Sequence, residues 1–162
     1  MGNDVVDLWR WNDWTRRQLA PLIESVKAKD LVREHAGGSK SVHRTMEHLL
    51  GAQEAWRNRL AGGDPTFRPP EVTVDGGAIN RAWSASDAAM LTFVQSLAGS
   101  DWARRYRWVR RTDQREFEVT FEVVLRHAAT HTVHHRSEVT AMLRAFGYDI
   151  PSCDYIRYAT GV

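Results

Sequence analysis

Four of the seven histidines of this sequence fall within the segment Arg126-His127-Ala-Ala-Thr-His131-Thr-Val-His134-His135-Arg136-Ser-Glu138. Residues 120–146, which include it, contain no proline or glycine, and apolar side chains recur there at helical spacing. Successive side chains of an α-helix turn by about 100°, so His127, His131 and His135 lie one turn apart on one face, with Glu138 in the same sector. The segment therefore predicts a long helix with a face of histidines.

His131 and His135 have the spacing at which two imidazoles of one helix bind a single metal ion. A pair at this spacing also arises by chance, and a single histidine on a helix is usually an ordinary polar residue. Several imidazoles on one face are harder to accommodate without a shared partner, because desolvating polar groups costs free energy. We therefore predict that this pair supplies two metal ligands and that a third comes from elsewhere in the chain.

Three neighbours of the pair have roles that the sequence leaves open. Glu138 is a candidate catalytic residue, either as a general base or as a partner that orients a ligand, and a salt bridge to Arg136 or Arg59 explains it equally well. His127 could replace one ligand, or it could contact the ligands without binding the metal itself. His134 points slightly away and is a second candidate catalytic residue, lining either the site or a helix contact.

The composition is that of one soluble globular domain over residues 1–162. The formal net charge is only +2, and the basic run at 104–111 is better explained as a solvated hairpin than as a nucleic-acid patch, so no nucleic-acid partner is expected. Cys153 is the only cysteine, which excludes an intrachain disulfide and a thiolate-rich zinc site. Because a signal peptide and a membrane-length apolar run are both lacking, we expect a cytoplasmic protein without a membrane partner.

Helical periodicity predicts an all-α fold, a four-helix bundle with helices over residues 4–26, 41–61, about 81–99 and 120–146. Pro21 is expected to kink or restart the first helix, and Ser39 or Ser41 can cap the second. Residues 62–79 are rich in glycine and proline, which predicts a long connection between the second and third helices. This connection is expected to cover a site or to pack against the outside of the bundle.

The period changes before the last helix. Residues 106–110 and 115–119 alternate, with Thr112 and Asp113 at the turn, which suggests a short β-hairpin. Thr120 can then cap the last helix and Gly147 can end it. The tail to residue 162 is expected to be irregular.

The third metal ligand is predicted on the second helix. His48 lies on its inward stripe beside the small residues Gly51, Ala52 and Ala55, which leave room for a bound group. Four-helix bundles bind metals in their core with side chains from facing helices, so we expect His48 to meet the histidine pair there. His43 lies on another face of the same helix and is expected to be exposed.

Two segments of the chain resemble the DinB/YfiT-like superfamily, which is associated with metal-dependent enzymes. Residues 41–56 are similar to the family's second helix, in which a histidine precedes a leucine-rich turn and a tryptophan. Residues 127–147 are similar to its last helix, with two histidines four apart, an arginine after the second, and a Leu-Arg-x-x-Gly ending. The resemblance implies a bundle, often dimeric, that holds one divalent ion on His48, His131 and His135.

The resemblance also implies a chemistry. Three neutral imidazoles with open positions form a catalytic type of site, for which zinc is the first candidate and nickel the second. The implied function is a transferase or hydrolase acting on a small electrophilic substrate with water or a low-molecular-weight thiol, in a homodimer. Two alternatives stay open: a non-catalytic bundle that binds metal or a small ligand, and a dimeric interaction protein whose histidines are merely polar core.

Overall fold

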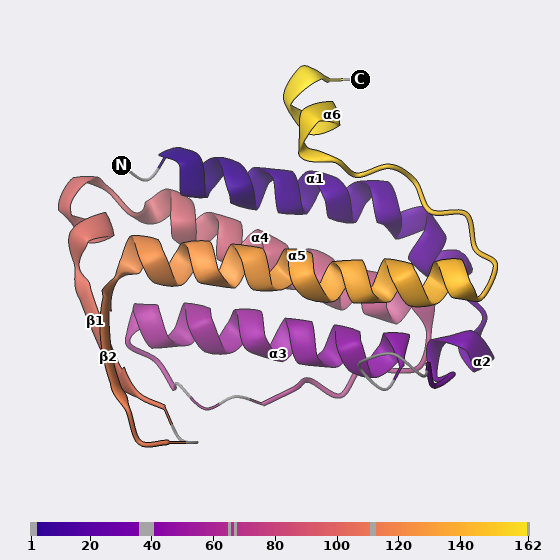
Figure 1. Cartoon of the computed structure of the whole chain (residues 1–162), viewed down its shortest axis with the longest axis horizontal. Helices are drawn as coiled ribbons and strands as arrows, with labels where there is room; N and C mark the ends of the chain where they lie inside the picture. The colour runs from indigo at the N-terminus through magenta and orange to yellow at the C-terminus, as the bar shows by residue number, and fades with distance from the viewer. Residues whose placement is uncertain (1–2, 36–40, 65, 67, 111–112, 162) are drawn as a thin grey trace.

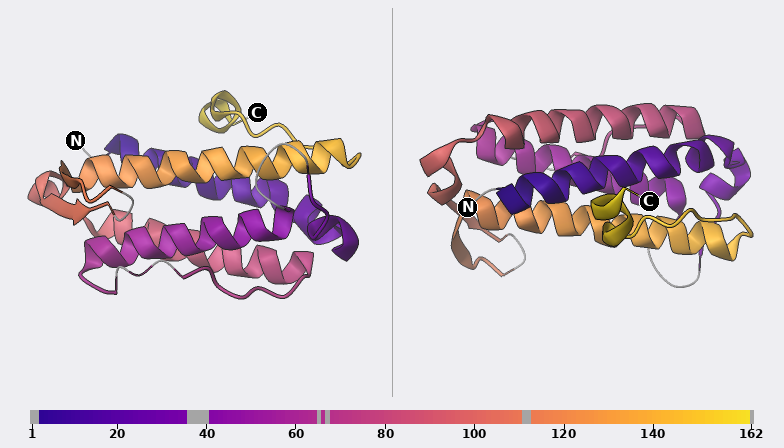
Figure 2. Two further views of the ribbon diagram at one scale, coloured as in Figure 1. Left: turned by 60° about the horizontal axis from the view of Figure 1, so that its bottom comes forward. Right: turned by 90° about the horizontal axis from the view of Figure 1, so that it is seen from above.

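A computed structural model describes residues 3–35, 41–64, 66, 68–110 and 113–161 (Figure 1). Its four long helices are α1 (Asn3–Ser25), α3 (Val42–Ala61), α4 (Gly76–Ser96) and α5 (Phe121–Ala145). Helix α1 packs against α4 and α5, and α3 packs against the same two helices, so the four enclose one core (Figure 2). The predicted all-α four-helix bundle is confirmed.

The connection between α3 and α4 runs the length of the bundle, so these two helices point the same way and oppose α1 and α5 (Figure 1). It is held to α3 by Glu47, whose carboxylate accepts a hydrogen bond from the backbone of Val72 at 3.3 Å. His43 Nε2 lies 2.7 Å from the carbonyl oxygen of Val72. His43 is therefore buried, and its predicted exposure is wrong, because the connection packs over this face of α3. The connection lies on the outside of the bundle, one of its two predicted positions.

Helix α4 begins several residues earlier than predicted. The Asp75 carboxylate accepts a hydrogen bond from the backbone of Ala78 at 2.8 Å and caps the helix. Gly76, which appeared to belong to the loop, is buried where α4 meets α1, and a Cβ there would lie 2.1 Å from the carbonyl oxygen of Ile23. Here glycine permits a close approach of two backbones rather than a turn.

The other helix ends follow the sequence closely. The Ser41 hydroxyl accepts a hydrogen bond from the backbone of Arg44 at 3.2 Å and caps α3, whereas the alternative cap Ser39 lies outside the described residues. Helix α1 continues through Pro21, so it does not restart there. The short helix α2 (Ala28–Leu31) follows it. Thr120 caps α5, and Gly147 follows its end with a positive φ of 91°.

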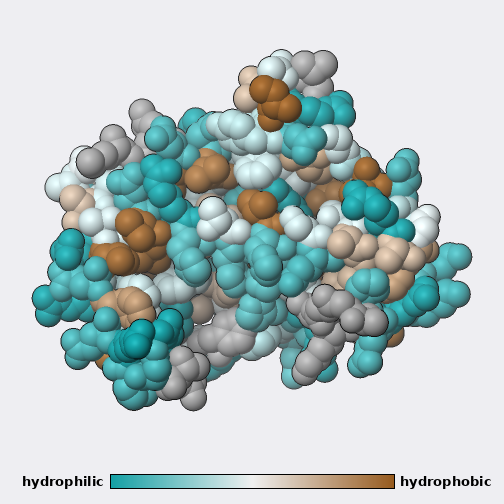
Figure 3. Space-filling view, in the orientation of Figure 1, coloured by the Kyte–Doolittle hydropathy of each residue, from teal (hydrophilic) through white to brown (hydrophobic). Residues whose placement is uncertain are grey.

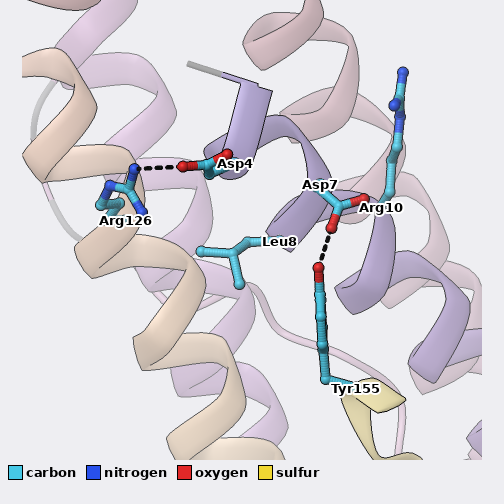
Figure 4. Close-up of a pocket in the computed structure, with 6 residues that line it drawn as sticks. All are labelled: Asp4, Asp7, Leu8, Arg10, Arg126 and Tyr155. Carbon is cyan, nitrogen blue, oxygen red and sulfur yellow. Dashed lines mark hydrogen bonds and ion pairs between the residues drawn. The ribbon is translucent and has the colours of Figure 1, made fainter. Parts of the chain in front are cut away.

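The predicted hairpin consists of β1 (Arg105–Val109) and β2 (Glu116–Thr120), which pair antiparallel after the 3₁₀ helix η1 (Gly99–Ala103). Thr112 of the predicted turn lies outside the described residues. The tail is not wholly irregular, because it forms α6 (Tyr155–Thr160) against α1. Tyr155 and Tyr158 both donate hydrogen bonds to the Asp7 carboxylate, and Figure 4 shows the Tyr155 contact beside the Asp4–Arg126 ion pair.

The core consists of two apolar clusters, one toward each end of the bundle. Between them, each long helix contributes buried polar residues, and we call this set the polar layer: Asn12, Arg16, Gln53, Asp87, Thr132 and Arg136. Gln53 Nε2 donates to Asp87 Oδ1 at 2.9 Å and to Thr132 Oγ1 at 3.2 Å, which joins three helices. Burial raises the pKa of Asp87 to about 7, although Gln53 and Arg16 oppose the rise.

The face on which α3 and α5 lie side by side is mostly hydrophilic, with hydrophobic residues in separate patches (Figure 3). Within the described part of the chain, no helix has the length and apolar character needed to cross a membrane.

Candidate metal centre

Three predicted ligands meet between α3 and α5. His48 comes from α3, and His131 and His135 come from α5, one turn apart. One ring nitrogen from each lies within 4.8 Å of the other two. The ring centroids of His48 lie 5.5 Å from His131 and 4.6 Å from His135. The fold thus brings together residues that are more than eighty positions apart in the sequence.

The nitrogens of the α5 pair face each other, with Nε2 of His131 and Nε2 of His135 separated by 3.1 Å. On the other side of the His135 ring, Nδ1 lies 2.7 Å from the Glu138 carboxylate. A carboxylate accepts a hydrogen bond, so Nδ1 must carry the proton, and in the neutral ring Nε2 keeps its lone pair. The arrangement therefore turns the lone pair of His135 Nε2 toward His131.

The separation of the two Nε2 atoms of His131 and His135 suits a metal ion. Zinc binds imidazole nitrogen at about 2.0–2.1 Å, so two ligands of one ion lie roughly 2.9–3.4 Å apart at tetrahedral or octahedral angles. The Nε2 separation of 3.1 Å falls within this range. Burial, followed by the neighbouring His135, lowers the pKa of His131 to about 4, and burial likewise lowers the pKa of His48. Both rings are therefore neutral near pH 7, the state in which imidazole binds metals.

The site lies at the surface and not in the bundle core. His48 is exposed, and His131 and His135 are half-buried. The expectation of an inward-facing His48 is therefore wrong, because Thr45, Ala52 and Ala55 fill the buried face of α3 instead. The exposure of His48 leaves this ligand accessible to a small molecule.

Glu138 and His134 lie beside the ligands. Glu138 contacts Nδ1 of His135, and its other oxygen lies 3.3 Å from Nε2 of His134. The sequence offered Arg136 and Arg59 as salt-bridge partners of Glu138. In the structure Arg136 donates a hydrogen bond to Asn12, and Arg59 stacks over a tryptophan. The contacts of Glu138 suit a residue that orients a ligand, whereas its role and that of His134 in catalysis stay predictions.

A row of aromatic rings, which we call the aromatic wall, connects the histidines to the hairpin and consists of His127, Trp56 and Trp108. The His127 ring lies 6.0 Å from the His131 ring and 5.4 Å from Trp56, which in turn lies 6.1 Å from Trp108. Among the described residues, the possible metal ligands form two groups, His48 with His131 and His135, and His134 with His135 and Glu138. His127 belongs to neither group. The sequence did not reveal this wall, because alternation in the hairpin shows which strand residues share a face but not which helix they contact.

The fold and the site define a class of protein, the four-helix bundle in which histidine side chains from two helices converge. The DinB family matches residues 1–161, and the chain belongs to this family.

Solved structures show the same fold. The chain is similar to a DinB-like protein from Bacillus subtilis, with a TM-score of 0.70 and 17% identity over 94% of this chain and 99% of that one. It is also similar to a DinB-like protein from Bacillus cereus, with a TM-score of 0.65 and 17% identity over 86% and 90% of the two chains. No curated protein matches the sequence. At such low identity these likenesses establish the fold, and the function must be argued from the site.

Proposed function

We propose that this protein is a metal-dependent enzyme in which His48, His131 and His135 hold one divalent ion. The observation that carries the proposal is the 3.1 Å approach of the two Nε2 atoms, with Nδ1 of His135 held by Glu138 at 2.7 Å. Zinc is the first candidate and nickel the second, since imidazole suits both metals. Three protein ligands leave at least one position open, as in catalytic sites.

When bound, the ion would polarise a substrate oxygen or favour the deprotonated form of a thiol or water. The residues of the chain supply the surroundings. Glu138 fixes the ring and the tautomer of His135, which raises the basicity of Nε2. The exposure of His48 leaves the site open to a small molecule, and Trp56 offers an aromatic surface beside His127. We infer transfer of a low-molecular-weight thiol, or of water, to a small electrophile.

Metal content tests the binding step. The purified, tag-free protein should contain or take up about one equivalent of zinc or nickel. The triple variant His48→Ala, His131→Ala, His135→Ala should bind none, whereas His127→Ala and His134→Ala should keep the metal. These two controls remove imidazoles from the same helix without touching the proposed set. A parent protein that stays empty after addition of metal would overturn the proposal, as would a triple variant that binds normally.

A second measurement separates the enzyme from a binding protein. Thiol-dependent conversion of a model electrophile should require the metal and should be lost in His131→Ala. A protein that binds metal but shows no turnover with thiols or water would be a non-catalytic bundle. Sedimentation analysis should show a homodimer, the assembly that we propose for this chain.

A further inference from the structure

The tail that precedes α6 runs beside α1 and α5 (Figure 2), and residues of all three segments line a cavity. Its volume is about 420 Å³, which is in the range of small-molecule sites. Its lining includes Trp11 from α1, Arg136 and Arg144 from α5, and Cys153 from the tail. The candidate ligands His131 and His135 do not line it.

Arg136 is a buried cation that forms no ion pair within 4.0 Å among the described residues, although Asp87 of the polar layer lies near enough to interact with its charge. Arg136 is only 6% exposed, its Nη1 donates to Asn12 Oδ1 at 3.0 Å, and its guanidinium stacks on the Trp11 ring at 4.7 Å. Among the described residues, no carboxylate oxygen lies within 4.0 Å of it. A guanidinium has five N–H donors, and burying its charge without an anion is costly. The remaining donors are therefore available to a ligand in the cavity.

Arg126, earlier on the same helix, shows the contrasting case. It lines a separate cavity near the start of α1, where it pairs with Glu122 at 2.9 Å and with Asp4 at 3.7 Å (Figure 4). Its charge is thus balanced by the protein itself. Arg126 and Arg136 both contact α1, but in the described part of the chain only Arg126 has a carboxylate oxygen within 4.0 Å.

Arg144 is a second cation in the lining of this cavity. Arg144 lies two turns beyond Arg136 on α5, with Thr140 between them, so the three residues form one stripe along the cavity. Arg144 is exposed, and it too has no carboxylate oxygen within 4.0 Å among the residues that the structure describes. Asp154 is the acidic residue in the lining, and one of its oxygens accepts a hydrogen bond from Ser152 at 3.0 Å. The basic side of the cavity therefore belongs to α5 and the acidic side to the tail.

The rest of the lining includes apolar surface. Leu19 of α1, Val133 of α5 and Ile150 of the tail contribute it. A guanidinium binds an oxyanion through paired hydrogen bonds, and apolar walls favour a ligand with a hydrocarbon body. We propose that this cavity binds a small organic acid, with its carboxylate or phosphate on Arg136 and Arg144 and its apolar part against Leu19 and Ile150.

Cys153 permits a direct test, because it is the only cysteine of the chain and it lines the cavity. Its reaction with the neutral reagent 4,4′-dithiodipyridine is followed while hexanoate, hexyl phosphate or uncharged hexanol is titrated in. The variants are Arg136→Gln, Arg144→Gln and the matched control Arg126→Gln. The histidine triple variant is included, so that binding of the acids to a metal at that site cannot produce the signal.

Hexanoate or hexyl phosphate should slow the reaction of Cys153 saturably, and hexanol should not. The tighter of the two acids identifies the preferred head group. Arg136→Gln should weaken binding by about tenfold or more, because a hydrogen bond to a charged group contributes about 1.5–3 kcal/mol. If this buried change prevents folding, Arg144→Gln carries the test with a smaller loss. Absence of protection, equal protection by hexanol, or equal weakening in Arg126→Gln would overturn the proposal.

Discussion

Replacing Asp87 by asparagine should change how the stability of the protein depends on pH. Asp87 is 2% exposed, and its Oδ2 has no hydrogen-bond partner among the described residues, although Nε of Arg16 lies 3.7 Å away. Burial therefore dominates and raises the pKa of this carboxyl from 3.8 to about 7. Asparagine has nearly the same shape and can still accept the hydrogen bond from Gln53, but it carries no charge at any pH.

The direction in which stability changes with pH follows from the number of protons that the folded and unfolded states bind. Below pH 3.8 Asp87 is protonated in both states and costs nothing. Between that value and about 7 the unfolded chain is ionised and the folded protein is not, so stability falls by about 1.36 kcal/mol per pH unit as pH rises. Above pH 7 the full cost is present, about 4 kcal/mol for the whole interval. The lowered pKa of His131 acts in the opposite direction, but it is common to wild type and variant and cancels in their difference.

Urea denaturation of metal-free wild type and Asp87→Asn between about pH 5 and pH 8 measures this difference. The free energy of unfolding of the wild type should fall by about 3 kcal/mol relative to the variant over that range. Asp113→Asn is the control for sign. Arg110 lowers the pKa of Asp113, so the stability of the wild type relative to this variant cannot fall as the pH rises. A difference between wild type and Asp87→Asn that stays constant within about 0.5 kcal/mol would refute the reasoning.

Three further outcomes are expected. Glu138→Gln should weaken metal binding by about 10- to 100-fold in competition with a chelator, because the Glu138 carboxylate lies 2.7 Å from Nδ1 of the ligand His135. His134→Gln should change it far less, because the His134 ring meets the His135 ring only edge-to-face, at 4.9 Å between centroids. Gly76→Ala should destabilise the fold by about 1–3 kcal/mol in thermal or urea unfolding, because its Cβ would meet a backbone oxygen at 2.1 Å. Gly77→Ala, whose Cβ would meet only side-chain ends at 3.2 Å, should stay within about 0.5 kcal/mol of wild type. Adding zinc at about 100 times its dissociation constant should raise the stability of the metal-free protein by about 2.7 kcal/mol, and an unchanged melting temperature would count against a folded-state site.

The features that the sequence predicted best are local ones. Helix α5 was predicted because residues 120–146 have helical periodicity and contain no breaker, and Thr120 and Gly147 mark its ends. That His131 and His135 lie on the same face of the helix follows from helix geometry alone. That His48 meets them depends on how α3 packs against α5, and the expectation came from resemblance to a family as much as from the residues.

Features set by tertiary packing could not be predicted from the sequence. Gly76 looked like part of a loop because its close contact is with Ile23, some fifty residues away. His43 was expected to be exposed because helical periodicity cannot show that Val72 of a long connection returns to cover it. The tail helix depends on contacts with Asp7 at the other end of the chain. Each miss involves a partner that is distant in the sequence.

The polar layer explains why one helix can carry two separate sites. Consecutive residues of α5 differ by about 100° around its axis, so His135 faces α3 while Arg136 faces α1. Thr132 lies between these two sides and is tied through Gln53 to Asp87 on α4. A buried hydrogen-bonded layer fixes the rotation of a helix more strictly than apolar packing does, because every misaligned donor loses its partner. Thr132→Val should therefore loosen both sites of α5 together, which would be measured as weaker metal binding and as faster reaction of Cys153. Substitutions confined to the histidine site or to the Arg136 cavity should affect only one of these two measurements.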